Sequence, residues 1–136
     1  MSSPPGIVVV DTDVVSFFFK GDTRSDLYRP HLAGQTFIIA AQTRAELELW
    51  ALERNWGVRK IAALRKYLKR FALAPLDEDI CVRWAAATDT ARRSGRPISC
   101  ADAWVAATAL SYSVPLVTHN AGDYAGVAGL TVISES

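Results

Sequence analysis

The sequence predicts an α/β protein, a three-layer α/β/α sandwich in which helices cover both faces of a central parallel sheet. Short apolar runs, of the length of buried strands, alternate along the chain with longer stretches of helical periodicity. A chain of 136 residues, half of them hydrophobic, fits one domain with a substantial core. We therefore expect a single domain over residues 1–136, with its core between about residues 7 and 133.

The expected strands are short and apolar. Residues 7–10 form a continuous apolar run that ends at Asp11, which is typical of a strand buried on both faces. The same reasoning predicts strands at 36–40, 73–76, 114–118 and 130–133. Since they are separated by helical stretches, they are expected to pair in parallel.

The expected helices lie between these strands, and most are followed by a glycine. Periodicity and stop signals predict helices at 13–20, 26–32, 44–55, 58–71, 79–94 and 100–112. Asp13 stands where an N-cap is expected for the first helix. In the fourth helix, Ile61, Leu64 and Leu68 share one face, with basic residues between them. The last helix is rich in alanine.

The net charge of +1 neither favours nor excludes nucleic acid, but the distribution of charge is uneven. No acidic residue occurs between Glu53 and Asp77, whereas seven cationic side chains do: Arg54, Arg59, Lys60, Arg65, Lys66, Lys69 and Arg70. Such a block is either a solvated helix face or a surface that follows a phosphate backbone. In the second case, Arg59, Arg65, Lys66 and Lys69 are the candidate substrate-binding residues.

Three carboxylates are candidates for chemistry. Asp11 ends the first strand, and ligands of open parallel sheets bind beyond the carboxyl ends of the strands. Glu46 and Asp102 lie three residues after Thr43 and Ser99, the spacing of a capping box, so each has a structural alternative. For Glu46 alone, the cap explains the pattern sufficiently.

The joint pattern favours a metal site. Asp11, Glu46 and Asp102 fall at neighbouring strand and helix ends, and Asn120 or Asp123 follows a third strand. Two carboxylates about 4 Å apart repel by roughly 4 kcal/mol at an effective dielectric near 20, a cost that a divalent cation removes. Oxygen ligands favour Mg²⁺ or Mn²⁺, and the two histidines have no spacing suited to zinc.

These segments resemble the PIN-domain ribonucleases, and among them the VapC-like toxins of bacterial toxin–antitoxin pairs. The resemblance spans about residues 7–133 and is carried, in the family's order, by residues 8–16, 44–47, 100–110 and 116–124. The segment around Asp102 is the most specific of them.

The resemblance implies an endonuclease that cleaves RNA, usually as a homodimer, and that a small antitoxin protein inhibits. It implies Mg²⁺ or Mn²⁺ held chiefly by Asp11 and Asp102, with Glu46 completing the cluster and positioning or deprotonating the attacking water. The family's fourth acidic position varies, and either Asn120 or Asp123 occupies it here. An uncharged Asn120 would leave one metal held more firmly than two.

The sequence also permits two alternative functions. Asp11 and Asp13 also fit the first motif of haloacid dehalogenase-like phosphatases, with Thr118 as the second motif. That family requires a later lysine and acidic pair, which the last eighteen residues lack. The second alternative is a non-catalytic interaction module, because residues 17–19 are three successive phenylalanines and cannot all face inward on one helix. Apolar surface near them is a candidate antitoxin or dimer contact.

The expected location is the cytoplasm. Residues 1–6 have no basic region and no cleavage site of the secretory type, and no apolar run is long enough to span a bilayer. Cys81 and Cys100 have no metal-ligand spacing and are expected to be free thiols.

Overall fold

A computed structural model describes residues 6–136, and its centre is a five-stranded sheet. The strands are β1 (Ile7–Val10), β2 (Thr36–Ile39), β3 (Ala72–Leu73), β4 (Leu116–Val117) and β5 (Val132–Ile133). They lie in the order β3-β2-β1-β4-β5, and every pair is parallel. The predicted parallel sheet is therefore confirmed, although β3, β4 and β5 are shorter than expected. Residues 1–5, over which no signal segment is predicted, lie outside the described part.

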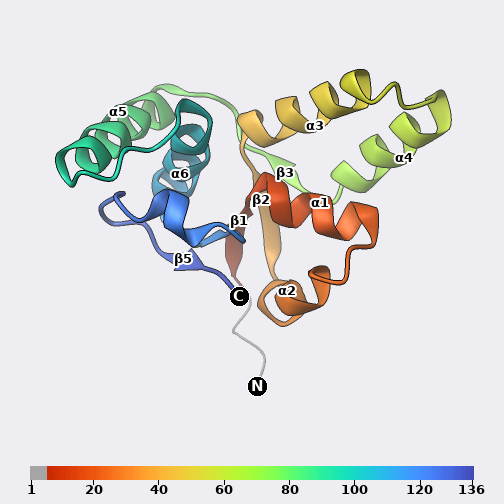
Figure 1. Ribbon diagram of the computed structural model, residues 1–136, viewed down its shortest axis with the longest axis horizontal. Helices are drawn as coiled ribbons and strands as arrows, with labels where there is room; N and C mark the ends of the chain where they lie inside the picture. The colour runs from red at the N-terminus through yellow and green to blue at the C-terminus, as the bar shows by residue number, and fades with distance from the viewer. Residues whose placement is uncertain (1–5) are drawn as a thin grey trace.

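Six α-helices and one short 3-10 helix connect the strands. They are α1 (Thr12–Lys20), α2 (Ser25–Leu32), α3 (Ala41–Glu53), α4 (Val58–Leu68), α5 (Glu78–Arg93), α6 (Cys100–Tyr112) and η1 (Ala121–Tyr124). Helices α5 and α6 cover one side of the sheet and α1 to α4 the other (Figure 1). The three-layer sandwich predicted from the sequence is confirmed.

Alternation along the strands divides the core into two layers. Val9 and Leu116 pack with the apolar residues of α5 and α6. Val8, Val10 and Val117 face the opposite layer, with the apolar residues of α1 to α4. Because successive side chains of a strand point to opposite faces, the three consecutive valines of β1 serve both layers. Val9 and Val10 are 0% and 1% exposed, as expected of the central strand.

The alanines of α6 bring this helix close to the sheet. Ala103, Ala106, Ala107 and Ala109 are each 0% exposed. In a close-packed interior, such small side chains allow the helix backbone to approach its neighbours closely. Helix α6 contacts both α5 and β1, so its first turn, which carries Asp102, is placed near the end of the central strand.

The structure differs from the sequence expectations at two helix starts. Asp11, not Asp13, is the N-cap of α1, and its carboxylate accepts a hydrogen bond from the Thr12 backbone N–H. Helix α3 begins at Ala41 instead of residue 44, because the chain passes from β2 into the helix through Ala40 without a polar cap. The short helix η1 was not expected, since four residues carry no periodic signal.

The structure also bears on the expectations about membranes and thiols. Among the residues from 6 to 136, no helix has the length and apolar character needed to cross a membrane. Cys81 and Cys100 are free, as predicted, and both are exposed.

Candidate active site

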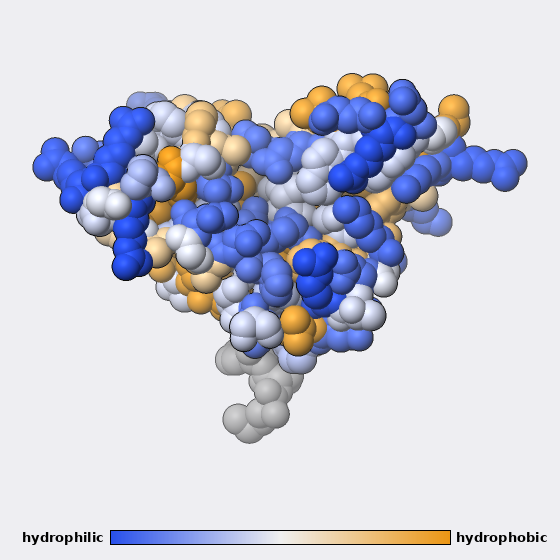
Figure 2. Space-filling view, viewed as in Figure 1, coloured by the Kyte–Doolittle hydropathy of each residue, from blue (hydrophilic) through white to orange (hydrophobic). Residues whose placement is uncertain are grey.

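The carboxyl ends of the central strands open into a small cavity of about 180 Å³. It is lined by Asp11, Thr12, Asp13, Glu46, Trp50, Asp102, Asn120 and Asp123. The structure therefore brings together all five residues that the sequence predicts for the cluster, although they come from four separate segments. Figure 2 shows that the molecule is notched at this end, between the α5–α6 side and the α3–α4 side, with hydrophilic residues below the notch.

Asp11 is the most buried carboxylate of the cavity, at 7% exposure. Its Oδ2 accepts hydrogen bonds from the hydroxyls of Thr118 and Tyr124, both at 2.8 Å. Its Oδ1 accepts a bond from the Thr12 N–H, also at 2.8 Å. Burial, reinforced by the nearby charge of Asp13, raises the pKa of Asp11 to about 6, although these hydrogen bonds oppose the shift.

Asp102 lies next to Asp11 on the first turn of α6. Ser99 caps this helix by accepting a hydrogen bond from the Asp102 backbone N–H at 3.0 Å, so half of the predicted capping box is present. The carboxylate itself points into the cavity, where its Oδ1 lies 3.3 Å from the Tyr124 hydroxyl. Burial, followed by the charge of Asp11, raises the pKa of Asp102.

Tyr124 joins the two carboxylates, and the sequence analysis gave it no role. Its hydroxyl has a single proton, and the shorter distance is to Asp11. The contact with Asp102 therefore has no proton of its own when the phenol donates to Asp11. Two partly buried carboxylates sharing one donor keep an unbalanced negative charge, which a cation would offset.

Glu46 is not part of a capping box, so the structural alternative predicted for it is wrong. The N-cap of α3 is Ala40, which makes no side-chain cap. Thr43 is buried and accepts a hydrogen bond from the Thr12 hydroxyl at 3.0 Å, which joins α3 to α1. Glu46 lines the cavity instead, and its carboxylate accepts one bond from the Gln42 amide at 3.0 Å.

Asp13 connects the start of α1 to the loop after β4 through hydrogen bonds. Its Oδ2 accepts hydrogen bonds from the His119 N–H at 3.0 Å and from the Asn120 side-chain amide at 2.9 Å. The Val14 N–H donates to its other oxygen at 2.7 Å. The Asn120 amide is thus committed to Asp13, whereas Asp123 adds a negative charge that raises the pKa of Asp102. Of the two candidates for the fourth acidic position, Asp123 is the one that brings charge to the cavity.

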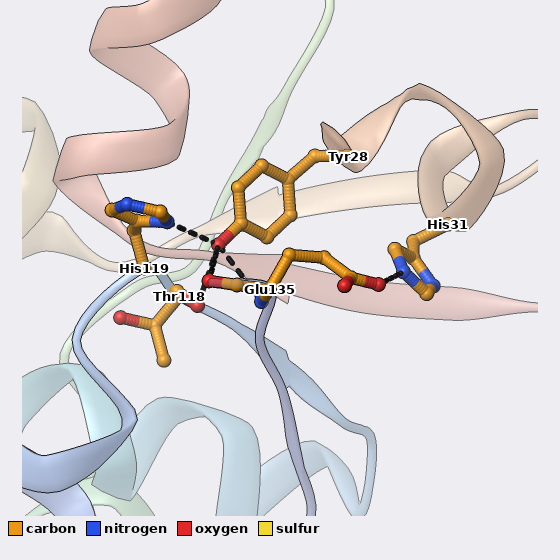
Figure 3. Close-up of polar contacts among 5 residues, drawn as sticks. All are labelled: Tyr28, His31, Thr118, His119 and Glu135. Carbon is orange, nitrogen blue, oxygen red and sulfur yellow. Dashed lines mark hydrogen bonds and ion pairs between the residues drawn. The ribbon is translucent and has the colours of Figure 1, made fainter. Parts of the chain in front are cut away.

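Tyr28 also contacts the loop after β4, through the His119 ring, as Figure 3 shows. The Tyr28 hydroxyl lies 2.6 Å from Nδ1 of His119 and accepts a hydrogen bond from the Glu135 N–H at 3.1 Å. Glu135 also contacts the His31 ring through its carboxylate, at 2.6 Å. The chain after β5, helix α2 and the Thr118 loop are therefore connected, which fixes the hydroxyl that Thr118 donates to Asp11.

The predicted substrate-binding residues lie apart from this cavity. Arg59, Arg65, Lys66 and Lys69 belong to α4 or follow it directly, and none lines the cavity. Arg65 donates to Glu48 of α3 at 2.8 Å, an exposed ion pair that joins the two helices. The role of this basic block in binding substrate stays a prediction.

The donor chemistry of the cavity fits a hydrated divalent cation. Within residues 6–136, no group of three or more His, Cys, Asp or Glu side chains is arranged so that it could hold a metal ion directly. The cavity nevertheless offers five carboxylates, of which Asp13 is engaged by three hydrogen bonds, and no sulfur or imidazole ligand. At roughly 30 Å³ per water, about 180 Å³ also leaves room for water molecules. Mg²⁺ retains several waters and binds through one or two carboxylates, so this arrangement suits it.

A family model and curated relatives both match this chain over most of its length. Residues 8–130 match the PIN domain family. "Ribonuclease VapC1" of Haemophilus influenzae strain R2866 is 25% identical over 126 residues, which cover 91% of this chain and 94% of that protein. "Ribonuclease VapC5" of Mycobacterium tuberculosis is 28% identical over 129 residues, covering 95% and 93%.

Solved structures show the same fold. VapBC-1 from nontypeable Haemophilus influenzae has a chain with a TM-score of 0.80 and 25% identity, covering 94% of this chain and 97% of that one. VapBC-5 from Mycobacterium tuberculosis, a member of the VapBC family of toxin–antitoxin systems, has a TM-score of 0.71 at 24% identity, covering 95% and 98%.

We expect Asp11→Asn to stabilise the metal-free protein near neutral pH and to have little effect below about pH 4. The raised pKa means that the folded state binds the Asp11 proton more tightly than the unfolded chain. The free energy of unfolding therefore falls as pH rises from about 4 to about 6, by up to roughly 3 kcal/mol for a shift of about two units. Urea unfolding in chelator, at both ends of this range, measures the difference between wild type and variant. Asp89→Asn, at an exposed site, is the control, and an identical pH dependence in wild type and Asp11→Asn would contradict the prediction.

We expect Tyr124→Phe to destabilise the metal-free protein by about 1–2 kcal/mol, because Asp11 loses a buried hydrogen-bond donor. The pKa of Asp11 should also rise, since this bond lowers it. Urea unfolding and its pH dependence measure both effects. Tyr112→Phe, at a residue that is 40% exposed, is the control. An unchanged free energy of unfolding would show that the hydroxyl does not stabilise the carboxylate.

Proposed function

Because the chain belongs to the PIN domain family, we propose that it is a metal-dependent endoribonuclease and the toxin of a toxin–antitoxin pair. The observation that carries the proposal is the convergence of Asp11, Glu46, Asp102 and Asp123 on one cavity. Relatives named as VapC ribonucleases, which match this chain over nearly their whole length, support the same reaction class.

The phosphatase alternative is not favoured. It requires Asp13 to act as the acid/base, but three hydrogen bonds commit this carboxylate to the backbone of α1 and to the loop after β4. The match to the PIN domain family over residues 8–130 gives no support to that class of enzyme either.

The four carboxylates proposed to form the site, Asp11, Glu46, Asp102 and Asp123, have different surroundings. This difference supports a division of roles among them. When bound, Mg²⁺ or Mn²⁺ supplies a Lewis acid that polarises a phosphate oxygen and acidifies a water. Asp11 and Asp102 would hold the cation, and Asp123 would complete the negative charge around it. Thr118 and Tyr124 fix the Asp11 carboxylate in one orientation. Such buried support is what keeps a ligand in place.

Glu46 is the residue that positions or deprotonates the attacking water. Its carboxylate is only partly buried and has a single hydrogen bond, from Gln42, so it is free to accept a proton from water. The Thr12–Thr43 hydrogen bond keeps α3 against α1 and so holds Glu46 opposite Asp11. Hydrolysis then requires the water to attack in line with the leaving oxygen of the phosphodiester.

We expect Asp11→Asn and Asp102→Asn to lower the rate of RNA cleavage at least about 100-fold in the presence of Mg²⁺, because each removes a charged ligand. A chelator should abolish wild-type cleavage, and Mg²⁺ or Mn²⁺ should restore it. Asp89→Asn, in an exposed ion pair with Arg93, is the matched control and should retain full activity. Full activity of both site variants, or of the wild type in chelator, would overturn the proposal.

The proposed antitoxin partner fits a groove of about 570 Å³ between α1, α2 and α4. Phe18, Phe37, Tyr67 and Phe71 line it together with Arg29 and Arg70. Of the three successive phenylalanines, Phe17 is buried, whereas Phe18 is only partly buried and contributes to this groove. Aromatic walls with two cations suit a segment that has apolar anchors and acidic residues. The expected homodimer stays a prediction, which sedimentation measurements test.

We expect the double variant Arg29→Glu/Arg70→Glu to weaken antitoxin binding at least 10-fold by reversing the charge at the groove. RNA cleavage by the free protein should be unaffected, because neither arginine lines the active-site cavity. Arg83→Glu, on the opposite side of the sheet, is the control. Titration calorimetry with the purified antitoxin measures the affinity, and an affinity equal to that of wild type would exclude this groove.

A further inference from the structure

A second, larger cavity adjoins the carboxylate cluster on the side of α6. Its volume is about 450 Å³, within the range of roughly 300–1,000 Å³ found for small-molecule sites. It is lined by Arg96, Pro97, Ser99, Asp102, Gly122 and Asp123. Since Asp102 and Asp123 line both cavities, a ligand held in this one reaches directly to the proposed reaction centre.

Arg96 is the cation among the residues that line this second cavity. Within residues 6–136 it forms no ion pair within 4.0 Å, whereas Arg83 and Arg93 of the preceding helix pair with Asp79 and Asp89. A guanidinium that stands beside two carboxylates without pairing with either keeps its donors for another anion. Its planar donor set suits a phosphate, which it can bind through two parallel hydrogen bonds.

The backbone at Arg96 is fixed by its surroundings. Its N–H donates to the Ala91 carbonyl at 3.0 Å, which holds the turn after α5. A Cβ at Gly126 would lie 2.6 Å from the Arg96 carbonyl oxygen, so the segment after η1 approaches this turn closely because it has a glycine there. Pro97 restricts the backbone of Arg96 further. The side chain therefore starts from a defined position beside Asp102 and Asp123.

We propose that Arg96 binds the phosphate next to the scissile one, so that the second cavity receives the neighbouring nucleotide of the RNA. This inference rests on the proposed ribonuclease function and gives the site a substrate-positioning residue outside the carboxylate cluster. The carboxylates repel the phosphates that flank the reaction centre, and Arg96 offsets this repulsion on the α6 side. The RNA strand is thereby directed across the cluster toward the turn between α5 and α6.

The first test is kinetic. With a short oligoribonucleotide that the wild type cleaves in Mg²⁺, Arg96→Ala should raise KM about 10-fold and leave kcat within about threefold, because the lost contact positions substrate without acting on the reacting atoms. Arg96→Lys should recover part of the affinity and Arg96→Gln little of it. Arg92→Ala, which removes an exposed arginine from the end of α5, is the control and should behave as wild type.

The dependence on salt gives a further measurement for Arg96→Ala. The slope of log kcat/KM against the logarithm of the salt concentration should become shallower by about 0.7, as expected for one lost phosphate contact on a single strand.

The second test identifies the phosphate. Substrates carrying one uncharged methylphosphonate linkage, moved stepwise away from the cleavage site, should raise the wild-type KM most at the adjacent position on one side. Arg96→Ala should be insensitive to that same substitution. Additive effects of the variant and the modified linkage, or an unchanged KM for Arg96→Ala, would overturn the inference while wild-type cleavage still stood. Absence of RNA cleavage by the wild type would overturn the proposed function itself and this inference with it.

Discussion

The carboxylate of Asp11 is buried at the end of the central strand, and the surrounding structure compensates for the cost of keeping it there. Two hydroxyls and one backbone N–H donate to it, and they come from opposite ends of the chain. These bonds lower its pKa, but burial and the charge of the neighbouring Asp13 outweigh them. The carboxylates of the site therefore carry negative charge that no cation within residues 6–136 balances through an ion pair. Such uncompensated negative charge favours the binding of a divalent cation.

The strand order explains why hydrogen-bond donors for the buried Asp11 carboxylate are available at this position. β1 lies between β2 and β4, and the chain crosses from one half of the sheet to the other around it. Side chains that follow β1 and β4 therefore meet those that open α3 and α6, in the crevice that such a reversal creates. The buried alanines of α6 then bring Asp102 within reach of the Tyr124 hydroxyl that also serves Asp11.

The sequence was sufficient for the fold and for four of the five acids that line the cavity, Asp13 being the exception, because these features depend on local patterns. The apolar run at 7–10, the alternation of strands and helices and the motif around Asp102 each report on nearby residues. Tyr124 and Thr118 escaped assignment because their hydrogen bonds to Asp11 span 113 and 107 residues, and no local spacing encodes such a contact. The capping interpretations of Asp13 and Glu46 failed because both helices begin earlier than expected, with Asp11 and Ala40 as their N-caps. Asp13 accepts hydrogen bonds from the distant His119 and Asn120, whereas Glu46 accepts one from Gln42 of its own helix.

These long-range bonds also affect when the site exists during synthesis. The ribosome produces Asp11 more than one hundred residues before Thr118 and Tyr124. Until then the central strand lacks β4, its neighbour on one side, and the carboxylate lacks both hydroxyl donors. A nascent or prematurely terminated chain therefore carries the acidic residues without the assembled crevice. The site is complete only after Tyr124 has been translated and β4 has paired with β1.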